Sequence, residues 1–290
     1  MHHTLICAQQ LKALQQSGKP LLVFDCSFDL LQPALGDAQF LQGHIAGAVR
    51  ANLEQDLCGG KGSQAINGGR HPLPTRAHLA AWLNRLGFRN DMQAVVYDRQ
   101  GMNYCGRLWW MLQWAGHEAV AVLDGGWQAW QQIEGAIQTG PQAPPPSPGA
   151  YTLQAEKVSL VSTETLLKNL GRANQNLVDA RDAARFRGEV EPFDPVAGHI
   201  PGAQNRPFKD NFDSQGRFKP ANQLLAQWRH LLAGRAPESV VHHCGSGVSA
   251  IPNILAMKIA GLGTTALYAG GWSEWCSNPQ RPVVTQGAQD

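Results

Sequence analysis

Paired cysteines, long apolar runs and clusters of basic residues are all missing from this sequence of 290 residues. The six cysteines are scattered, and without a Cys-x-x-Cys pair a structural zinc site is not expected. No apolar run approaches the roughly 18 residues that span a membrane. The net charge is only +2, and the absence of a basic cluster argues against nucleic acid as a partner.

A secretory signal is missing as well. Residues 1–7 lack a charged region followed by a long apolar core. Scattered cysteines in a chain without such a signal are typical of a reducing compartment, so we expect a cytoplasmic protein with no membrane partner. With 43% apolar and 16% charged residues, the composition is that of a globular protein, and the chain is long enough for two domains.

The chain contains an internal repeat. The motif Gly-His-Ile-x-Gly-Ala occurs at 43–48 and again at 198–203, and Gly-Gly-Trp occurs at 125–127 and again at 270–272. A period of about 150 residues indicates duplicated domains rather than a short-repeat solenoid. We therefore predict a first domain over residues 1–138, a proline-rich linker over 139–150 and a second domain over 151–290.

Short apolar strands alternate with helical patterns in each half. The predicted strands are 21–24, 94–97, 119–123, 177–178, 239–241 and 265–268. The predicted helices are 79–83, 108–112, 163–170 and 224–232. This alternation predicts an α/β fold in which each half forms a mainly parallel sheet covered by helices on both faces. Ligands of such sheets bind outside the carboxyl ends of the strands.

Cys244 lies at such a strand end. It follows an apolar strand end, Val240-Val241, and two histidines, and it precedes a Gly-Ser-Gly loop and a helical pattern that begins near Ile251. Pro252 fits the first turn of that helix, where its missing N–H is not needed. Backbone N–H groups at a helix N-terminus stabilise a thiolate, so Cys244 is a candidate nucleophile. A single cysteine can also be a small buried core residue.

These motifs together resemble the tandem-domain rhodaneses. The resemblance rests on Asp179-Ala180-Arg181, Arg185-Phe186, the two repeated motifs and the cysteine loop, and it covers nearly the whole chain. In that family only the second domain carries the catalytic cysteine. The first half agrees, since Asp98 follows its strand where a cysteine would stand, and Cys105 is expected to be a core residue.

The loop sequence Cys-Gly-Ser-Gly-Val is similar to that of the 3-mercaptopyruvate sulfurtransferases. Loops of thiosulfate-type rhodaneses carry basic residues instead, which suit a dianion. The resemblance implies that a Cys244 persulfide carries sulfur from the donor to a thiol or cyanide, with no cofactor and no metal. It further implies that the loop binds substrate and intermediate through Gly245, Gly247, Val248 and Ser249.

The resemblance also implies roles for side chains outside the loop. Ser246, His71 and Glu54 would form a Ser-His-acid relay that protonates the departing enolate. Arg185 would bind the donor carboxylate in a two-point contact. The family carries a second arginine where this chain has Phe193, so either another residue such as Arg181 or Arg187 replaces it, or the donor differs.

Other functions stay open at this point. Thiosulfate could be the donor. Alternatively, the protein could only carry persulfide to a partner such as thioredoxin. A turnover measurement would distinguish an enzyme from such a carrier. A phosphatase needs an arginine where this loop ends in Ala250. His242 and His243 stand on the strand beside the nucleophile, where packing is the expected role, because adjacent strand residues point to opposite faces.

Overall fold

The computed structural model describes residues 1–60, 65–145 and 147–285. Pro146 of the predicted linker and residues 286–290 of the predicted second domain lie outside the described residues. The chain forms two compact units. The first comprises Met1–Gln64, Pro74–Lys157 and Ser214–Phe218, and the second comprises Ala65–Leu73, Val158–Asp213 and Lys219–Asp290. Each unit therefore contains a short segment from the other half of the sequence.

The first unit is built on a five-stranded parallel sheet in the order β1-β6-β5-β2-β4. Its strands are β1 (Leu5–Ile6), β2 (Leu21–Asp25), β4 (Ala48–Arg50), β5 (Gln93–Tyr97) and β6 (Val120–Leu123). Its helices are α1 (Ala8–Gln16), α2 (Leu35–Gln42), α3 (Arg76–Arg85), α4 (Cys105–Trp114) and α5 (Gly126–Gln132). Two short strands, β3 (His44–Ile45) and β7 (Ile137–Gln138), pair antiparallel beside this sheet.

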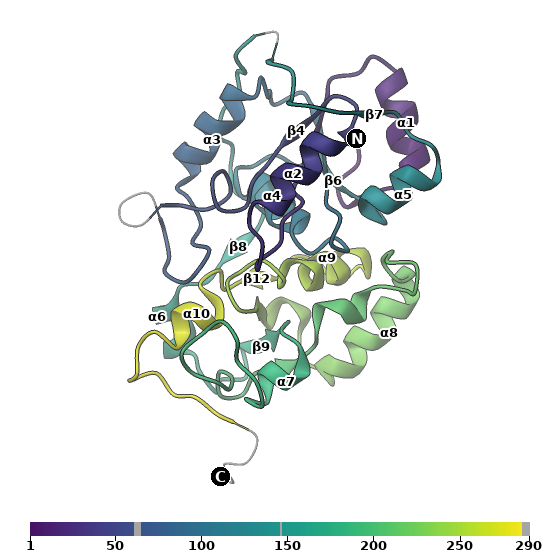
Figure 1. The fold of residues 1–290 in the computed structure, drawn as a ribbon. Coiled ribbons are helices and arrows are strands. Elements are labelled where there is room, and N and C mark those ends of the chain that lie inside the picture. Colours follow the sequence, from purple (N-terminus) through teal and green to yellow (C-terminus); the bar gives the residue numbers. More distant parts are fainter. Residues whose placement is uncertain (61–64, 146, 286–290) are drawn as a thin grey trace. The chain divides into compact units, whose positions relative to one another are not determined.

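The second unit repeats this plan, with a parallel sheet in the order β10-β9-β11-β12-β8. Its strands are β8 (Ser159–Leu160), β9 (Asn176–Asp179), β10 (Gln204–Asn205), β11 (Val240–His243) and β12 (Ala266–Leu267). Its helices, several of which are labelled in Figure 1, are α6 (Thr163–Lys168), α7 (Ala183–Phe186), η1 (Phe208–Asn211), α8 (Ala221–Leu232), η2 (Pro237–Ser239), α9 (Ile251–Ile259) and α10 (Gly271–Trp275).

Helices cover both faces of the central strands. Every residue of β5, β6, β9 and β11 is buried, although consecutive strand residues point to opposite faces. Strands buried in this way read as continuous apolar runs, which explains why they were recognisable in the sequence. On the outside, α8 contributes Leu224, Trp228 and Leu232, a buried stripe at four-residue spacing. The predicted fold class is thus confirmed.

The repeated histidine motif makes the same contacts in both units. His44 stacks on Phe40 with ring centroids 3.8 Å apart, and its Nδ1 lies 2.8 Å from the Phe40 carbonyl oxygen. His199 stacks on Phe186 at the same centroid distance, and its Nδ1 lies 2.7 Å from the Phe186 carbonyl oxygen. In the second unit this contact fixes the end of α7, the helix that carries Arg185.

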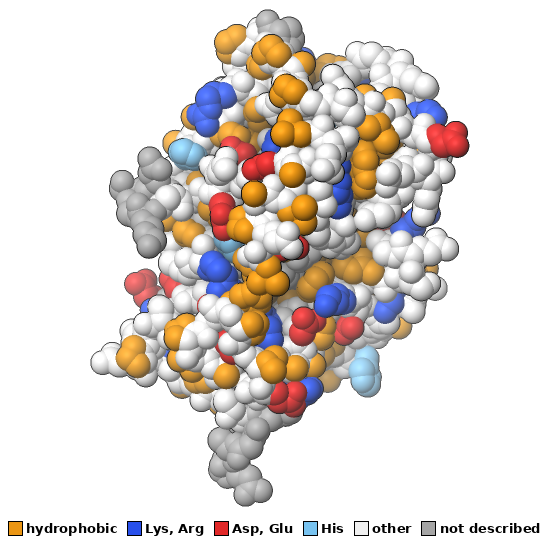
Figure 2. Space-filling view, viewed as in Figure 1, with side chains coloured by type: hydrophobic (Ala, Val, Ile, Leu, Met, Phe, Trp, Pro, Cys, Tyr) orange, Lys and Arg blue, Asp and Glu red, His pale blue; other side chains and the backbone are white. Residues whose placement is uncertain are grey.

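Among the described residues, no helix is both long and apolar enough to cross a bilayer. On the face drawn in Figure 2, basic and acidic side chains are interspersed, and among the described residues in view neither sign forms a continuous patch.

Candidate active site

Cys244 lies at the carboxyl end of β11, between the last strand residue and the loop that leads to α9. β11 is the middle strand of its sheet, with β9 on one side and β12 on the other. Cys244 is 2% exposed. Pro252 lies in the first turn of α9, as its missing N–H requires. The predicted strand, loop and helix around Cys244 are therefore all present.

The loop presents a ring of unused hydrogen-bond donors. Within the described part of the chain, no acceptor pairs with the backbone N–H groups of Gly245, Ser246, Val248, Ser249 or Ala250. Four of these residues are buried, and Ser249 is half-buried. Buried N–H groups are nearly always paired in proteins, so a set of free ones in the loop that follows Cys244 is a candidate binding place for an anion.

The Gly-Gly-Trp motif holds this loop in shape. The N–H of Trp272 donates to the Cys244 carbonyl at 2.8 Å, and the N–H of Ser273 donates to the Gly245 carbonyl at 2.9 Å. Gly271 has φ +60°, and a Cβ there would lie 2.6 Å from the Cys244 carbonyl oxygen. Gly247 has φ +71°, and a Cβ there would overlap the carbonyl oxygen of Ala269. Both positions therefore require glycine.

The matching loop of the first unit shows such donors in use. The carboxylate of Asp98 accepts hydrogen bonds of 2.8–2.9 Å from the N–H groups of Gln100, Met102, Tyr104 and Cys105. The N–H of Trp127 donates to the Asp98 carbonyl, as that of Trp272 does to Cys244. Burial raises the pKa of Asp98, while the four N–H groups act in the opposite direction. In the first unit, the anion that these N–H groups bind is therefore the Asp98 side chain itself.

Cys105 has no such environment. It is fully buried at the start of α4, as predicted for a core residue. Burial raises the pKa of its thiol well above the usual value, and the nearby Asp98 carboxylate adds to this effect. A thiol that resists ionisation is a poor nucleophile.

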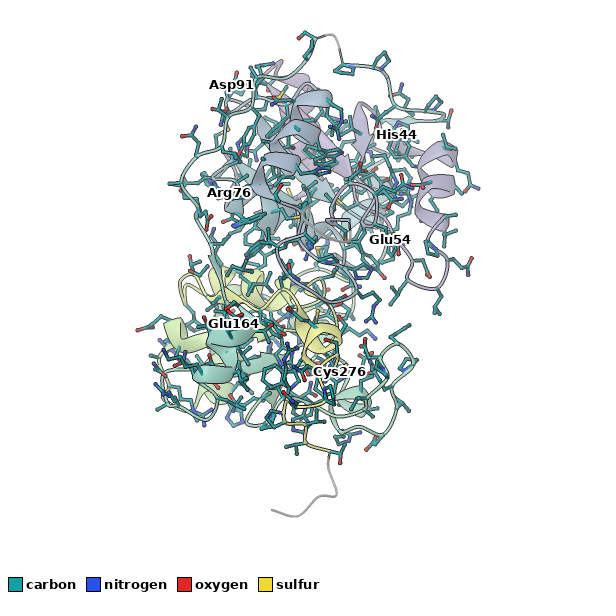
Figure 3. All side chains as sticks on the ribbon, turned by 90° about the vertical axis from the view of Figure 1, so that its left-hand side faces the viewer. His44, Glu54, Arg76, Asp91, Glu164 and Cys276 are labelled. Carbon is teal, nitrogen blue, oxygen red and sulfur yellow. The ribbon has the colours of Figure 1, made fainter. Side chains whose placement is uncertain are left out.

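Two of the predicted relay residues are in direct contact. His71 belongs to the segment Ala65–Leu73, which folds with the second unit. Its Nδ1 lies 2.7 Å from the hydroxyl oxygen of Ser246, and both side chains are buried. Glu54, labelled in Figure 3, belongs to the first unit; its side chain is exposed and its N–H donates to Asn52 Oδ1.

Two arginines lie against Gly245, the loop residue that follows Cys244. A Cβ on Gly245 would lie 3.2 Å from Nη2 of Arg70 and 3.6 and 3.7 Å from Nη1 and Nη2 of Arg185. Arg185, on α7, was predicted to bind the donor. Arg70 was missed, because the family pattern pointed to position 193; its place next to His71 in the chain was the available signal.

Carboxylates orient both guanidinium groups. Asp194 accepts from Arg70 Nη1 at 2.8 Å and from Arg185 Nη2 at 3.4 Å, so it bridges them. Glu191 accepts from Arg185 Nη2 at 2.6 Å. The ring of Phe193 lies under both guanidinium groups, at 5.4 Å from Arg70 and 5.1 Å from Arg185. The position where an arginine was expected therefore holds a surface on which two other arginines stack.

The other arginines considered have different partners. Arg181 is buried and bonds the Asp179 carboxylate at 2.7 Å and the Gly198 carbonyl at 2.7 Å. Arg187 is bound to Glu189 at 2.6 Å, and that carboxylate is largely exposed. Arg181 interacts electrostatically with Cys244, but its guanidinium is already bound by Asp179 and Gly198, whereas that of Arg70 lies against Gly245.

The strand histidines pack within the sheet, as expected. His242 is fully buried and edge-on to Trp228, with centroids 5.5 Å apart. Burial lowers its pKa to about 3. His243 lies 3.9 Å from the Asp179 carboxylate, and burial lowers its pKa even though Asp179 acts in the opposite direction. Among the described residues, no three His, Cys, Asp or Glu side chains are grouped to hold a metal ion.

Comparison with known proteins gives consistent matches along the chain. A family model described as "Rhodanese-like domain" matches residues 8–133 and 162–278. A Pseudomonas aeruginosa protein named "Probable 3-mercaptopyruvate sulfurtransferase" is 45% identical over 97% of this chain and 98% of the relative. A Mycobacterium tuberculosis protein named "Putative thiosulfate sulfurtransferase SseB" is 40% identical over 96% of each chain. The crystal structure of SseA from Escherichia coli, described with the 3-mercaptopyruvate sulfotransferases, has a TM-score of 0.77 at 28% identity and covers 93% of this chain and 99% of its own.

Proposed function

The chain belongs to the rhodanese family, and on that premise we propose that it is a sulfurtransferase that moves a sulfane sulfur from 3-mercaptopyruvate to a thiol. The observation that carries the proposal is the contact between His71 and Ser246 beside Cys244. A hydroxyl held by a histidine next to the nucleophile suits a donor whose departing carbon must be protonated. Thiosulfate releases sulfite, which needs no such proton.

The first step forms a persulfide on the enzyme. The Cys244 thiolate attacks the sulfur of 3-mercaptopyruvate, a sulfur–sulfur bond forms and the sulfur–carbon bond breaks. The electron pair of that bond passes to the carbon and gives the enolate of pyruvate, which takes up a proton. Cys244 is thereby oxidised to the persulfide and the donor carbon is reduced, so the step balances without a cofactor. An acceptor thiolate then attacks the outer sulfur and restores Cys244.

The loop stabilises the anionic states of this sequence. The free N–H groups of Gly245, Val248 and Ser249, with that of Ser246, suit the thiolate and the persulfide, and Gly247 gives the loop the curvature that this needs. The Asp98 carboxylate in the first unit supports this role, because the equivalent backbone there holds an anion.

Ser246 and His71 are proposed to deliver the proton to the enolate. Their 2.7 Å separation allows the imidazole to pass a proton to the hydroxyl as the hydroxyl passes its own on. Glu54 as the acid of this relay stays a prediction from the family resemblance. Arg185 is proposed to bind the donor carboxylate, since its guanidinium lies beside Gly245 and is oriented by Glu191.

The sulfur acceptor, the cellular compartment and the domain division are also part of the proposal. A thiol such as that of thioredoxin is the proposed acceptor, with cyanide as an assay substitute. The six cysteines are all free, which supports a cytoplasmic protein. We propose the division into a first domain over 1–138 without the nucleophile, a linker over 139–150 and a catalytic domain over 151–290 as a division of the sequence repeat, because in the structure the segment Ala65–Leu73 folds with the second unit.

Thiosulfate remains the second candidate donor, and one observation favours it. Although the loop itself has no basic residue, the guanidinium groups of Arg70 and Arg185 lie beside it and supply positive charge for a dianion. A relative at 40% identity also carries a thiosulfate sulfurtransferase name. A persulfide carrier would load Cys244 once and would not turn over.

A two-donor assay tests the proposal. Purified protein receives 3-mercaptopyruvate or thiosulfate with cyanide as acceptor, and Cys244→Ser is the control. We expect many turnovers with 3-mercaptopyruvate, a lower kcat/KM with thiosulfate and no turnover in the control. A preference for thiosulfate would overturn the donor but keep the nucleophile. A single equivalent of pyruvate per Cys244 would indicate a carrier.

A further inference from the structure

We propose that Arg70 binds the anionic group of the sulfur donor and supplies the cation that Phe193 does not. The inference rests on the proposed function and names a residue that determines donor specificity at the same site. Together with Arg185, Arg70 would form a two-arginine clamp for the carboxylate of 3-mercaptopyruvate. The two arginines come from segments far apart in the sequence.

The position of Arg70 relative to the nucleophile supports this role. Its Nη2 is the nearest neighbour of the Gly245 Cβ position, at 3.2 Å, and Gly245 directly follows Cys244. The next residue along the chain, His71, contacts Ser246 of the same loop. Arg70 and His71 therefore reach adjacent loop residues, one with a positive charge and one with a proton-transfer group.

The backbone that carries Arg70 is fixed. The N–H of Arg70 donates to the Oγ of Ser273 at 3.0 Å, and the N–H of Ser273 in turn donates to the Gly245 carbonyl of the loop. Gly69 has φ +91°, and a Cβ there would lie 2.6 Å from the Gly270 carbonyl oxygen. The segment therefore passes close to the start of α10 only because position 69 is glycine. A binding group on such a rigid support loses little freedom when it binds a ligand.

The guanidinium group keeps donors for a ligand. Asp194 takes one edge of Arg70, and the Phe193 carbonyl accepts from Nη1 at 3.3 Å. Nε of Arg70 is buried and has no hydrogen-bond partner among the described residues. Arg70 is 24% exposed and Arg185 15% exposed, so both groups are largely removed from water. An unpaired, desolvated donor on a guanidinium group that lies against the loop after Cys244 favours a bound anion.

Phe193 explains why the clamp is built this way. A benzyl side chain cannot bind a carboxylate, but its face supports both guanidinium groups, at 5.4 and 5.1 Å. Asp194, the next residue, bridges the same two groups. The loop 191–194 thus orients two arginines instead of contributing one.

A matched pair of donors separates donor binding from a structural role. Mercaptoacetone is 3-mercaptopyruvate with a neutral methyl group in place of the carboxylate. For Arg70→Gln we expect KM for 3-mercaptopyruvate to rise about 10- to 100-fold, as expected for one charged hydrogen bond. With mercaptoacetone we expect kcat/KM to change by less than about twofold, because the lost contact is to the carboxylate alone.

Further variants complete the test. Arg70→Lys keeps the charge without the planar fork and should fall between wild type and Arg70→Gln. Phe193→Arg in the Arg70→Gln background should lower KM for 3-mercaptopyruvate about tenfold relative to Arg70→Gln alone, because position 193 already contacts the guanidinium groups of both arginines. Arg187→Gln removes a guanidinium bound to Glu189 and should leave both donors unaffected.

Several outcomes would overturn the assignment. The first is that Arg70→Gln lowers kcat/KM equally with both donors, and the second is that it changes kcat/KM with neither. The third is that neither Arg70 variant folds, which would make Arg70 a structural support. If wild type uses thiosulfate and not 3-mercaptopyruvate, the proposed function fails on its own. The role of Arg70 is then tested by whether Arg70→Gln raises KM for thiosulfate while leaving kcat/KM for mercaptoacetone unchanged.

Discussion

Nδ1 of His71 lies 2.7 Å from the hydroxyl of Ser246, although the two residues are 175 positions apart in the chain. The contact arises because the segment Ala65–Leu73 folds with the second unit rather than with the half of the sequence that contains it. A histidine from the first half of the sequence thus contacts the loop that follows Cys244 in the second half.

If His71 and Ser246 act as one relay, the effects of substituting them on kcat should not be additive. We expect His71→Gln and Ser246→Ala each to lower kcat with 3-mercaptopyruvate about 100-fold, at the lower end for general acid catalysis. The double variant should be no worse than either single variant, because removal of one member already disables the pair. Steady-state kinetics check this, with exposed His230→Gln as control. Effects that multiply would contradict a shared role.

The positions of the nucleophile and the central strands could be predicted because buried parallel strands are apolar runs. The predicted strand 94–97 is observed as Gln93–Tyr97, and 239–241 as Val240–His243. The two-residue edge strands β8 and β10 were not predicted, since so short a stretch has no periodicity to detect.

Arg70 shows why the rest of the site was not predictable. Its role depends on which unit a loop packs against, and that is decided by close approach at Gly69 rather than by a local pattern. The family pattern directed attention to position 193 instead. The contact between His71 and Ser246 was anticipated only through the resemblance, because spacing alone does not bring position 71 to position 246.

Substitution by the corresponding amide, Glu54→Gln, tests whether Glu54 is the acid of the relay. Glu54→Gln keeps the shape and removes the negative charge that would stabilise a protonated His71. We expect kcat with 3-mercaptopyruvate to fall about tenfold, a loss on the order of 1.4 kcal/mol. In the His71→Gln background the same change should have no further effect. Gln55→Ala, also exposed, is the control, and a kcat for Glu54→Gln equal to wild type would remove Glu54 from the relay.

The glycine of the loop offers a test of its geometry. Gly247→Ala introduces both a strained backbone at φ +71° and an overlap with the Ala269 carbonyl oxygen. Gly261→Ala has a nearly identical φ of +73° and nothing within 4 Å, so it measures the backbone strain alone. We expect Gly261→Ala to lose about 1 kcal/mol of unfolding free energy and Gly247→Ala on the order of 3 kcal/mol. Urea unfolding checks this, and equal losses of unfolding free energy would mean that the loop adapts.

Below its melting temperature, Gly247→Ala should also lose persulfide formation, because the N–H groups of the loop after Cys244 move apart.

The buried histidines should make the protein sensitive to acid. Burial lowers the pKa of His242 from 6.5 to about 3, so the unfolded chain binds a proton that the folded protein does not. The unfolding free energy should therefore fall as pH drops from about 6.5 toward 3, by up to about 1.4 kcal/mol per pH unit for this one group. His242→Phe keeps a ring against Trp228 and removes the titrating group, so its stability should fall less steeply over the same range. Part of the slope should remain, since burial also lowers the pKa of His243. Exposed His230→Phe should keep the wild-type slope. Urea unfolding at a series of pH values measures all three proteins, and parallel curves for wild type and His242→Phe would show that His242 is already protonated or hydrated in the folded state.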